Sequence, residues 1–453
     1  MSQLFDGKRA YDHIVELAVN IGPRLCGTTS EKAAVDYVYD CFKSYGLKPA
    51  IQAFTMANDQ VLESKLEIVE PALGVIPCMQ QLGSKNTPPE GVTGDLVFVE
   101  GTSEPQVGPH IKGKIVVLVG SPVGSDRRNV LKYNPLAIVS VGSTIGSEPN
   151  TFHLVLKESL YPYESVPVLF ITYEDALRMF NSRARKATVT VRSTHEMGHS
   201  HYVTADVTGS EFPEQIVVIG GHIDSVPLEP GATDNAAGVA TIVELARIFA
   251  QKGSKRTLRF AAWGSEEQSG GGAMTYVHRL QKQDKDQKAD KEFIKGIDKT
   301  ELDNHLMYIN LDVLGMSLGH NGCHVDGLEE MGNYVKALSC ELGVPHEVRT
   351  DIYGSDNISF FSAGVPALSF ARLGTATQHM HTLRDTIDLI SVEQLEIIGR
   401  YLDVFISRTA AEGCLFPFKR QIPDDKMAMI KDRSFGLHMR AALKMIGAEP
   451  LDE

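Results

Sequence analysis

Histidine and carboxylate residues that could bind a metal recur from residue 222 onward, next to segments with the pattern of buried strands or helix starts. Imidazole and carboxylate groups without cysteine form a nitrogen and oxygen donor set. Such a set suits zinc best, with cobalt or manganese as substitutes. We therefore predict a metal site and an enzyme. The candidate residues are His222, Asp224, Asp234, Glu266, Glu267, Asp312 and His381.

Two adjacent glutamates, Glu266 and Glu267, predict a division of roles. Neighbouring side chains on an extended segment point in different directions, so Glu267 can bind a metal while Glu266 faces the attacking water. A catalytic zinc lowers the pKa of its water to about 7, and a free carboxylate can then remove and return the proton. Asp224, two residues after His222, is placed to hold the second imidazole nitrogen and so to fix its tautomer.

Four apolar runs position most of these candidates. Each run is continuous rather than alternating, as expected for parallel strands covered on both faces. His222, the glutamate pair, Asp312 and His381 each follow one run, and open α/β sheets bind ligands at the carboxyl ends of their strands. Asp234 instead lies at the start of an amphipathic helix. We predict an α/β fold with a mixed, mostly parallel sheet and helices on both faces, with strands at residues 215–221, 258–263, 306–311 and 366–373 and helices at residues 10–20, 30–46, 234–252, 269–283, 330–342 and 391–411.

The composition changes between about residues 62 and 195. Short β-rich runs alternate there with turn residues, and only one good helix, at residues 174–183, is predicted. We interpret this part as a separate domain inserted into the first. The predicted division is a catalytic domain of residues 1–62 and 198–412, a β-rich insert of residues 63–197 that could cover the site, and a C-terminal extension of residues 413–453.

The bulk properties predict a soluble globular protein. Of 453 residues, 43% are hydrophobic, and the net charge of −13 argues against nucleic acid or an anionic membrane as the main partner. No apolar run approaches the roughly 18 residues of a membrane span. The six scattered cysteines predict mostly buried free thiols in a reducing compartment. We predict a cytoplasmic protein, with secretion left open if a leader was removed, and a homodimer is one open arrangement.

Two other motifs compete with this site. Residues 195–199 read His-Glu-Met-Gly-His, the HExxH pattern of single-zinc proteases. That chemistry needs a helix that places both histidines on one face, whereas the flanks here are strand-like and Gly198 disfavours a helix. We predict a polar linker. Residues 269–272 are glycine-rich but lack the Lys-Ser/Thr pair of a phosphate loop, so we predict a turn into a helix.

Six short motifs resemble those of the co-catalytic di-zinc aminopeptidases. That family also holds bacterial leucyl aminopeptidases, plasma glutamate carboxypeptidase, the glutaminyl cyclases and the transferrin receptor ectodomain. The resemblance covers about residues 8–411, and the full set is highly specific. Residues 22–28 resemble the family's N-terminal motif, and residues 113–118 resemble the protease-associated domain often inserted there. The six motifs are Gly220-Gly-His222-Ile-Asp224-Ser, Gly231-Ala-Thr-Asp234-Asn-Ala-Ala-Gly, Trp263-Gly-Ser-Glu266-Glu267, Asn310-Leu-Asp312-Val, Ser355-Asp356 and His381-Thr-Leu-Arg-Asp385-Thr.

The resemblance implies a role for each candidate. Asp234 would bridge two zinc ions, with one ion completed by His222 and Asp312 and the other by Glu267 and His381. The implied general base is Glu266, and Asp224 would orient His222. The peptide bond after Asp234 is often cis in this family. All five implied ligands are present, which disfavours a transferrin-receptor-like loss of chemistry and the single-zinc glutaminyl cyclases.

The sequence departs from the family near the expected substrate. Relatives often carry Tyr before the last histidine and His after the Ser-Asp pair, and the residues here are Met380 and Asn357. The substrate-binding candidates are Ser355, Asp356 and Arg372, the last as a clamp for a carboxylate or as part of an ordinary salt bridge.

We expect hydrolysis of a peptide or a small amide, with an aminopeptidase as the first choice. A dipeptidase, a carboxypeptidase or a small-molecule amidase on the same site is the alternative. A non-catalytic binding protein on this fold is the alternative from another class.

Overall fold

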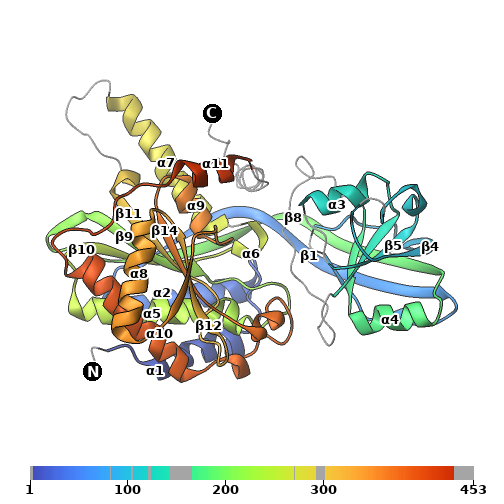
Figure 1. The fold of residues 1–453 in the computed structure, drawn as a ribbon, viewed down its shortest axis with the longest axis horizontal. Helices are drawn as coiled ribbons and strands as arrows, with labels where there is room; N and C mark the ends of the chain where they lie inside the picture. The colour runs from blue at the N-terminus through green and yellow to red at the C-terminus, as the bar shows by residue number, and fades with distance from the viewer. Residues whose placement is uncertain are drawn as a thin grey trace.

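The computed structural model describes residues 4–81, 83–103, 106–120, 124–142, 166–269, 271–291 and 301–432. The chain forms a larger and a smaller lobe, joined by two long strands (Figure 1). These strands are β1 (Ala50–Glu70) and β8 (Lys186–Val207), which pair antiparallel over most of their length. The predicted boundaries at residues 62/63 and 197/198 fall inside the two strands, so the division into domains stays a prediction.

The larger lobe is built on a mixed sheet with the strand order β13, β12, β14, β11, β9, β10 and β8. Neighbours from β14 to β10 are parallel, whereas β12 is antiparallel to β14 and β8 is antiparallel to β10. The predicted α/β fold class is therefore confirmed. Four of these strands match predicted ones, namely β9 (Phe212–His222), β10 (Arg256–Trp263), β11 (His305–Leu311) and β14 (Ala367–Leu373).

Two strands of this sheet were not predicted: β12 (His320–Asp326) and β13 (His346–Arg349). Both are short and carry polar residues, so neither contains the continuous apolar run that marks the central strands. The pair adds an edge to the sheet beyond β14.

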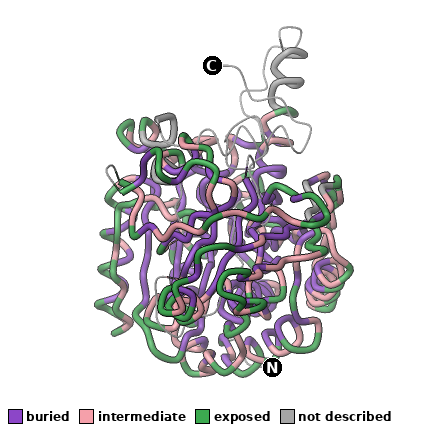
Figure 2. The backbone as a smooth tube through the Cα atoms, turned by 90° about the vertical axis from the view of Figure 1, so that its right-hand side faces the viewer, coloured by how far each residue is buried: buried purple, intermediate pink, exposed green. Residues whose placement is uncertain are grey.

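Both faces of the central strands are covered, as the continuous apolar runs require (Figure 2). Val217 and Ile219 of β9 face a core formed with α1 (Gly7–Ile14), α2 (Thr29–Ser44), α5 (Ala237–Lys252) and α10 (Val392–Ile406). Ile216 and Val218 face the opposite core, which contains residues of α7 (Gly271–Lys291) and α9 (Asn357–Ser362). Successive residues of one strand thus serve two cores.

Helix ends refine the predicted boundaries. Thr28, not the expected Ser30, caps α2 by accepting the N–H of Glu31. Ser391 caps α10, as predicted. The helix expected from residue 234 begins as α5 at Ala237, and the Asn235 side chain accepts the N–H of Gly238 at 3.1 Å. The other α-helices described in this lobe are α6 (Glu266–Ser269), α8 (Glu329–Leu342) and α11 (Asp424–Asp432). The weak helix expected around residues 437–445 lies outside the described residues.

The smaller lobe has its own apolar clusters. Its parallel strands are β4 (Val92–Val99), β5 (Ile115–Val119), β6 (Ala137–Val141) and β7 (Val168–Ile171). The short β3 (Met79–Gln80) pairs with β7, and the short β2 (Gly74–Ile76) pairs with β1. The predicted helix is present as α4 (Tyr173–Asn181). A second helix, α3 (Gly124–Leu131), was missed because its sequence is mostly polar and lacks a helical apolar stripe.

The HExxH segment lies within strand β8, where Glu196 pairs with Asn58 and His199 with Thr55. Because successive side chains of a strand alternate between faces, this segment lacks the helical context of a single-zinc protease. The expectation that it is not the active site is supported by this backbone.

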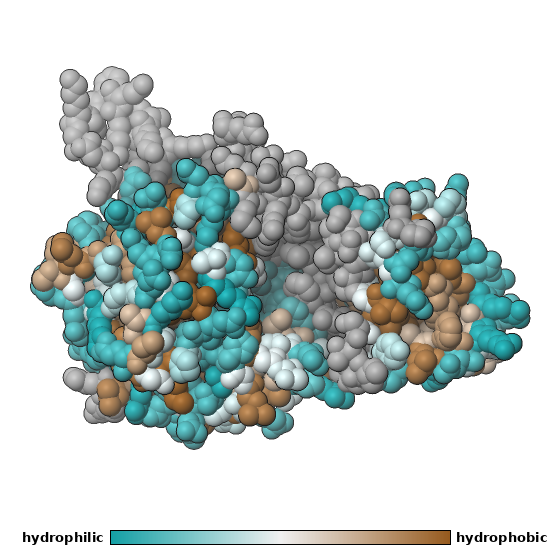
Figure 3. Space-filling model, viewed as in Figure 1, coloured by the Kyte–Doolittle hydropathy of each residue, from teal (hydrophilic) through white to brown (hydrophobic). Residues whose placement is uncertain are grey.

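The predictions from amino-acid composition concern the cysteines, the surface and membrane-spanning helices. All six cysteines are free, but only Cys26 and Cys323 are buried, so the expectation of mostly buried thiols was wrong. Polar side chains cover much of the visible face of the larger lobe, with apolar ones scattered among them (Figure 3). Within the described part of the chain, every helix is too short or too polar to cross a membrane.

We expect Gly221→Ala to destabilise the fold. A Cβ atom at Gly221, in β9, would lie 2.4 Å from the Leu311 carbonyl oxygen of the neighbouring strand. The overpacking should cost about 1–3 kcal/mol and lower the thermal unfolding midpoint. Gly322→Ala in β12 is the matched control, because its Cβ would meet nothing closer than 3.8 Å. Equal midpoints for the two variants would contradict this packing.

Candidate metal centre

The predicted site residues come from the carboxyl ends of adjacent strands. His222 ends β9, Glu266 and Glu267 open α6 just after β10, and Asp312 follows β11 directly. His381 lies in the loop after β14. Because β9, β10, β11 and β14 are parallel, these ends share one edge of the sheet.

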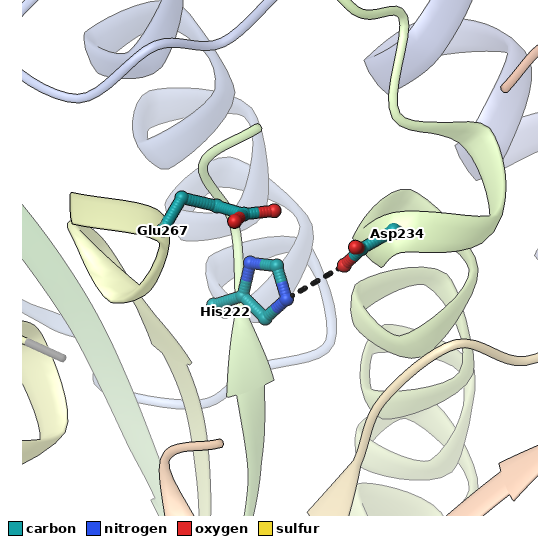
Figure 4. A group of neighbouring side chains, drawn as sticks. All are labelled: His222, Asp234 and Glu267. Carbon is teal, nitrogen blue, oxygen red and sulfur yellow. Dashed lines mark ion pairs between the residues drawn. The ribbon is translucent and has the colours of Figure 1, made fainter. Parts of the chain in front are cut away.

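Asp234 reaches the same edge from the segment Ala232–Ala236, which precedes α5 and has a cis peptide bond between Asp234 and Asn235. Asp234 faces two imidazoles with its two oxygens. Its Oδ1 lies 3.0 Å from His222 Nε2, and its Oδ2 lies 2.9 Å from His381 Nε2. Figure 4 shows His222 at the strand end and Asp234 at the start of the helical segment, with Glu267 beside them.

Asp312 and Glu267 supply the other two carboxylates of the site. Asp312 Oδ1 is 3.3 Å from His222 Nε2, and Glu267 Oε1 is 3.5 Å from His381 Nε2. One ligand atom each from His222, Asp234 and Glu267 lies within 4.8 Å of the others. The five residues therefore form two donor groups that share Asp234.

A metal ion fits this donor set. Glu267 is buried, and its Oε1 has no hydrogen-bond donor among the described residues. A buried carboxylate oxygen without a donor is unfavourable, whereas a cation satisfies it. Two imidazoles and three carboxylates without thiolate are donors that zinc accepts.

The charges of the site act strongly on one another. Burial alone would raise the pKa of Asp234, but hydrogen bonds from His222 and His381 hold that pKa below its usual range. Burial raises the pKa of Glu267 to about 7, although His381 opposes the shift. Exclusion of water also raises the pKa of Glu266 well above its usual value, and the neighbouring Glu267 carboxylate adds to this shift.

Asp224 links the histidine to the glutamate pair. Its backbone carbonyl lies 3.0 Å from His222 Nδ1, while its carboxylate Oδ1 is farther away, at 3.7 Å. A carbonyl can only accept, so Nδ1 carries a proton, and Nε2, which faces Asp234 and Asp312, is the nitrogen available to a metal. The carboxylate instead accepts the N–H groups of Glu266 at 3.0 Å and Glu267 at 3.2 Å. The sequence predicted that Asp224 holds the second imidazole nitrogen of His222, and the group at hydrogen-bond distance is the Asp224 carbonyl.

Two supporting residues were within the recognised motifs but had no predicted role. Asp385 accepts the N–H groups of Thr233 and Asp234, both at 2.9 Å. Arg24 is fully buried and donates to five backbone carbonyls, among them that of Ile223 at 2.9 Å. An arginine in a Gly-Pro turn before an apolar helix was the available signal for the latter.

The substrate-binding candidates differ in what they already bind. Asp356 and Ser355 are buried, and neither the Asp356 carboxylate nor the Ser355 hydroxyl has a hydrogen-bond partner among the described residues. Arg372 instead donates Nε to the Met316 carbonyl at 2.6 Å and Nη1 to Asn321 Oδ1 at 2.9 Å. Asn357 donates to the Tyr353 carbonyl at 2.9 Å and to Asp326.

Metal removal is expected to destabilise the protein. A chelator takes away the cation that offsets repulsion between the buried carboxylates, and the thermal unfolding midpoint should fall by roughly 5–10 °C. Added Zn²⁺ should restore the midpoint and Mg²⁺ should not, because imidazole donors favour zinc. A midpoint insensitive to chelator and to Zn²⁺ would contradict a metal site here.

Comparison with known proteins finds a family model that matches part of this chain. The sequence model of peptidase family M28 matches residues 203–406. Human carboxypeptidase Q is 28% identical over 294 residues, which are 60% of this chain and 62% of that protein. The aligned part thus spans less than two thirds of that relative.

A second relative aligns over more of the chain. Aminopeptidase YwaD of Bacillus subtilis is 25% identical over 412 residues, 87% of this chain and 83% of that protein. The solved structure of BSAP, a zinc aminopeptidase from Bacillus subtilis, has the same fold, with a TM-score of 0.73 and 23% identity over 94% of this chain and 100% of that one. Residues 203–406 of this chain thus match peptidase family M28, and the relatives found are a carboxypeptidase and an aminopeptidase.

Proposed function

We propose that this chain is a peptidase that works with two zinc ions, for which cobalt or manganese could substitute. Asp234 would bridge the ions, with His222 and Asp312 on one side and Glu267 and His381 on the other. The observation that carries the proposal is the placement of the Asp234 oxygens, 3.0 Å and 2.9 Å from two imidazole nitrogens. The relatives named as a carboxypeptidase and an aminopeptidase support peptide-bond hydrolysis.

The chain's own groups supply proton transfer. Bound zinc would contribute Lewis acidity, which polarises a carbonyl and makes water more acidic. Glu266 is proposed to take the proton of the attacking water and to give it to the leaving amine. Burial raises its pKa, which makes the Glu266 carboxylate a stronger proton acceptor than an exposed glutamate. The Asp224 carboxylate accepts the backbone N–H of Glu266 and so fixes the backbone from which the Glu266 side chain projects.

Glu266→Gln is expected to lower kcat by at least about 10²–10⁴-fold, because the amide cannot accept the proton. Zinc content and the thermal unfolding midpoint should stay near those of the wild type. Glu196→Gln, in the HExxH segment on β8, is the control and should leave kcat unchanged within about twofold. If the Glu266 variant keeps its activity, or if the Glu196 variant loses it, the assignment of the base is wrong.

We further propose that the enzyme acts at the amino end of its substrate. The buried Asp356 carboxylate without a hydrogen-bond partner among the described residues suits a free α-ammonium group. Arg372, the candidate clamp for a terminal carboxylate, already donates to Met316 and Asn321. Similarity to carboxypeptidase Q favours a carboxypeptidase as the second candidate, with a dipeptidase or an amidase on the same site as further alternatives.

Matched peptides blocked at one end or the other test this preference. We expect acetylation of the amino end to abolish cleavage and amidation of the carboxyl end to be tolerated. Asp356→Asn should raise KM for free-amine peptides by about tenfold or more, because a charged hydrogen bond is lost. Cleavage that depends on a free carboxylate instead would favour the carboxypeptidase.

The broader expectations are part of the same proposal. They are a cytoplasmic location, a homodimer as an open arrangement, and a protease-associated-like insert that covers the site. A non-catalytic binding protein is the alternative from another class. It predicts no zinc after supplementation and no turnover of either blocked or free peptides.

A further inference from the structure

His381 has a backbone conformation that needs support. Its φ is +61°, in the left-handed region that residues other than glycine seldom adopt. The residue lies in the loop that follows β14, so no strand partner fixes it in the way that β9 fixes His222. The position of its imidazole depends on what holds this loop.

A buried glutamate holds it. Glu229 is fully buried, and its Oε1 accepts the backbone N–H of His381 at 2.6 Å. Glu229 was not among the residues expected to act in the site, because nothing in the pattern of residues 223–231 marks it.

The loop that carries Glu229 is itself fixed by Arg24. The guanidinium of this buried residue donates Nε to the Ile223 carbonyl at 2.9 Å, Nη1 to the Pro230 carbonyl at 2.7 Å and Nη2 to the Gly231 carbonyl at 2.9 Å. These bonds restrain the loop on both sides of Glu229. The carboxylate therefore presents its oxygen to His381 from a fixed backbone.

The loop that carries His381 in turn supplies a carboxylate to the segment that carries Asp234. Asp385, four residues after His381, accepts the N–H groups of Thr233 and Asp234, and the Asp385 carbonyl accepts the N–H of Ala232 at 3.1 Å. Each loop thus gives a carboxylate to the backbone of the other. Between the two contacts, Asp234 Oδ2 lies 2.9 Å from His381 Nε2.

We propose that Glu229 is a positioning residue that fixes His381 against Asp234 and thereby sets the affinity of the metal position formed with Glu267. The inference rests on the two-metal function proposed above. The other position has separate supports, because His222 is fixed through the Asp224 carbonyl and the Asp312 N–H bonds the Phe370 carbonyl at 3.1 Å. Loss of Glu229 should therefore weaken one position and spare the other.

Three variants and a control test this role. Glu229→Ala removes the acceptor, Glu229→Asp withdraws it by one methylene, and Glu229→Gln keeps an acceptor oxygen without the charge. Glu244→Ala is the control, because Glu244 is also buried and accepts a backbone N–H, that of Asp6 at 3.1 Å, away from the site. Zinc per chain is measured after dialysis against zinc buffers that span a range of free concentrations.

We expect the Ala and Asp variants to lose affinity for one of two zinc ions by about 10–100-fold, the effect typical of groups that support a metal ligand. Glu229→Gln should stay within about threefold of the wild type, and the control should keep both ions. Two ions bound with wild-type affinity by the Ala and Asp variants would overturn the role of Glu229. If Glu229→Ala does not fold, the Asp variant decides. A wild-type chain that binds fewer than two ions would overturn the two-metal function itself.

Discussion

Repulsion between buried carboxylates is the constraint that the site must resolve. Asp234, Glu267 and Asp312 share two imidazoles at one edge of the sheet, and Asp356 adds a further buried carboxylate. Like charges repel more strongly as water is excluded. The fold gathers these groups because parallel strands end at one edge, so a property of the backbone concentrates the charge. A cation shared by the carboxylates and imidazoles is the physical resolution.

A second set of carboxylates resolves the same problem with backbone N–H groups. Asp224 accepts from Glu266 and Glu267, Asp385 accepts from Thr233 and Asp234, and Glu229 accepts from His381. In each case the donor belongs to a proposed ligand, to the proposed base or to the neighbour of a ligand. Each buried carboxylate therefore fixes the backbone from which a functional side chain projects.

The sequence predicted the features that show as periodic apolar patterns or as residues at fixed spacing. Continuous apolar runs located the four central strands, and the residues after them gave four of the five donors that the structure brings together. The fifth donor, Asp234, was marked by the start of a helix. Contacts between loops distant in sequence carry no such period. Glu229 and His381 are 152 residues apart, so their hydrogen bond had no signal in the sequence. Polar strands such as β12 were missed because they lack a continuous apolar run. The continuation of β1 and β8 from one lobe into the other was also missed.

Strand β8 ties the smaller lobe to the metal centre through the backbone. One part of β8 pairs with β4 of the smaller lobe, and its last residues pair with β10, whose end leads to Glu266 and Glu267. The buried Glu31 carboxylate reinforces this junction by accepting from Ser200 of β8 and from the backbone of Gly27. A Cβ atom at Gly264 would collide with the same carboxylate, so the turn before the glutamate pair packs directly on it. Strand β8 therefore connects the smaller lobe, through continuous backbone, to the strand that precedes the residues proposed for proton transfer.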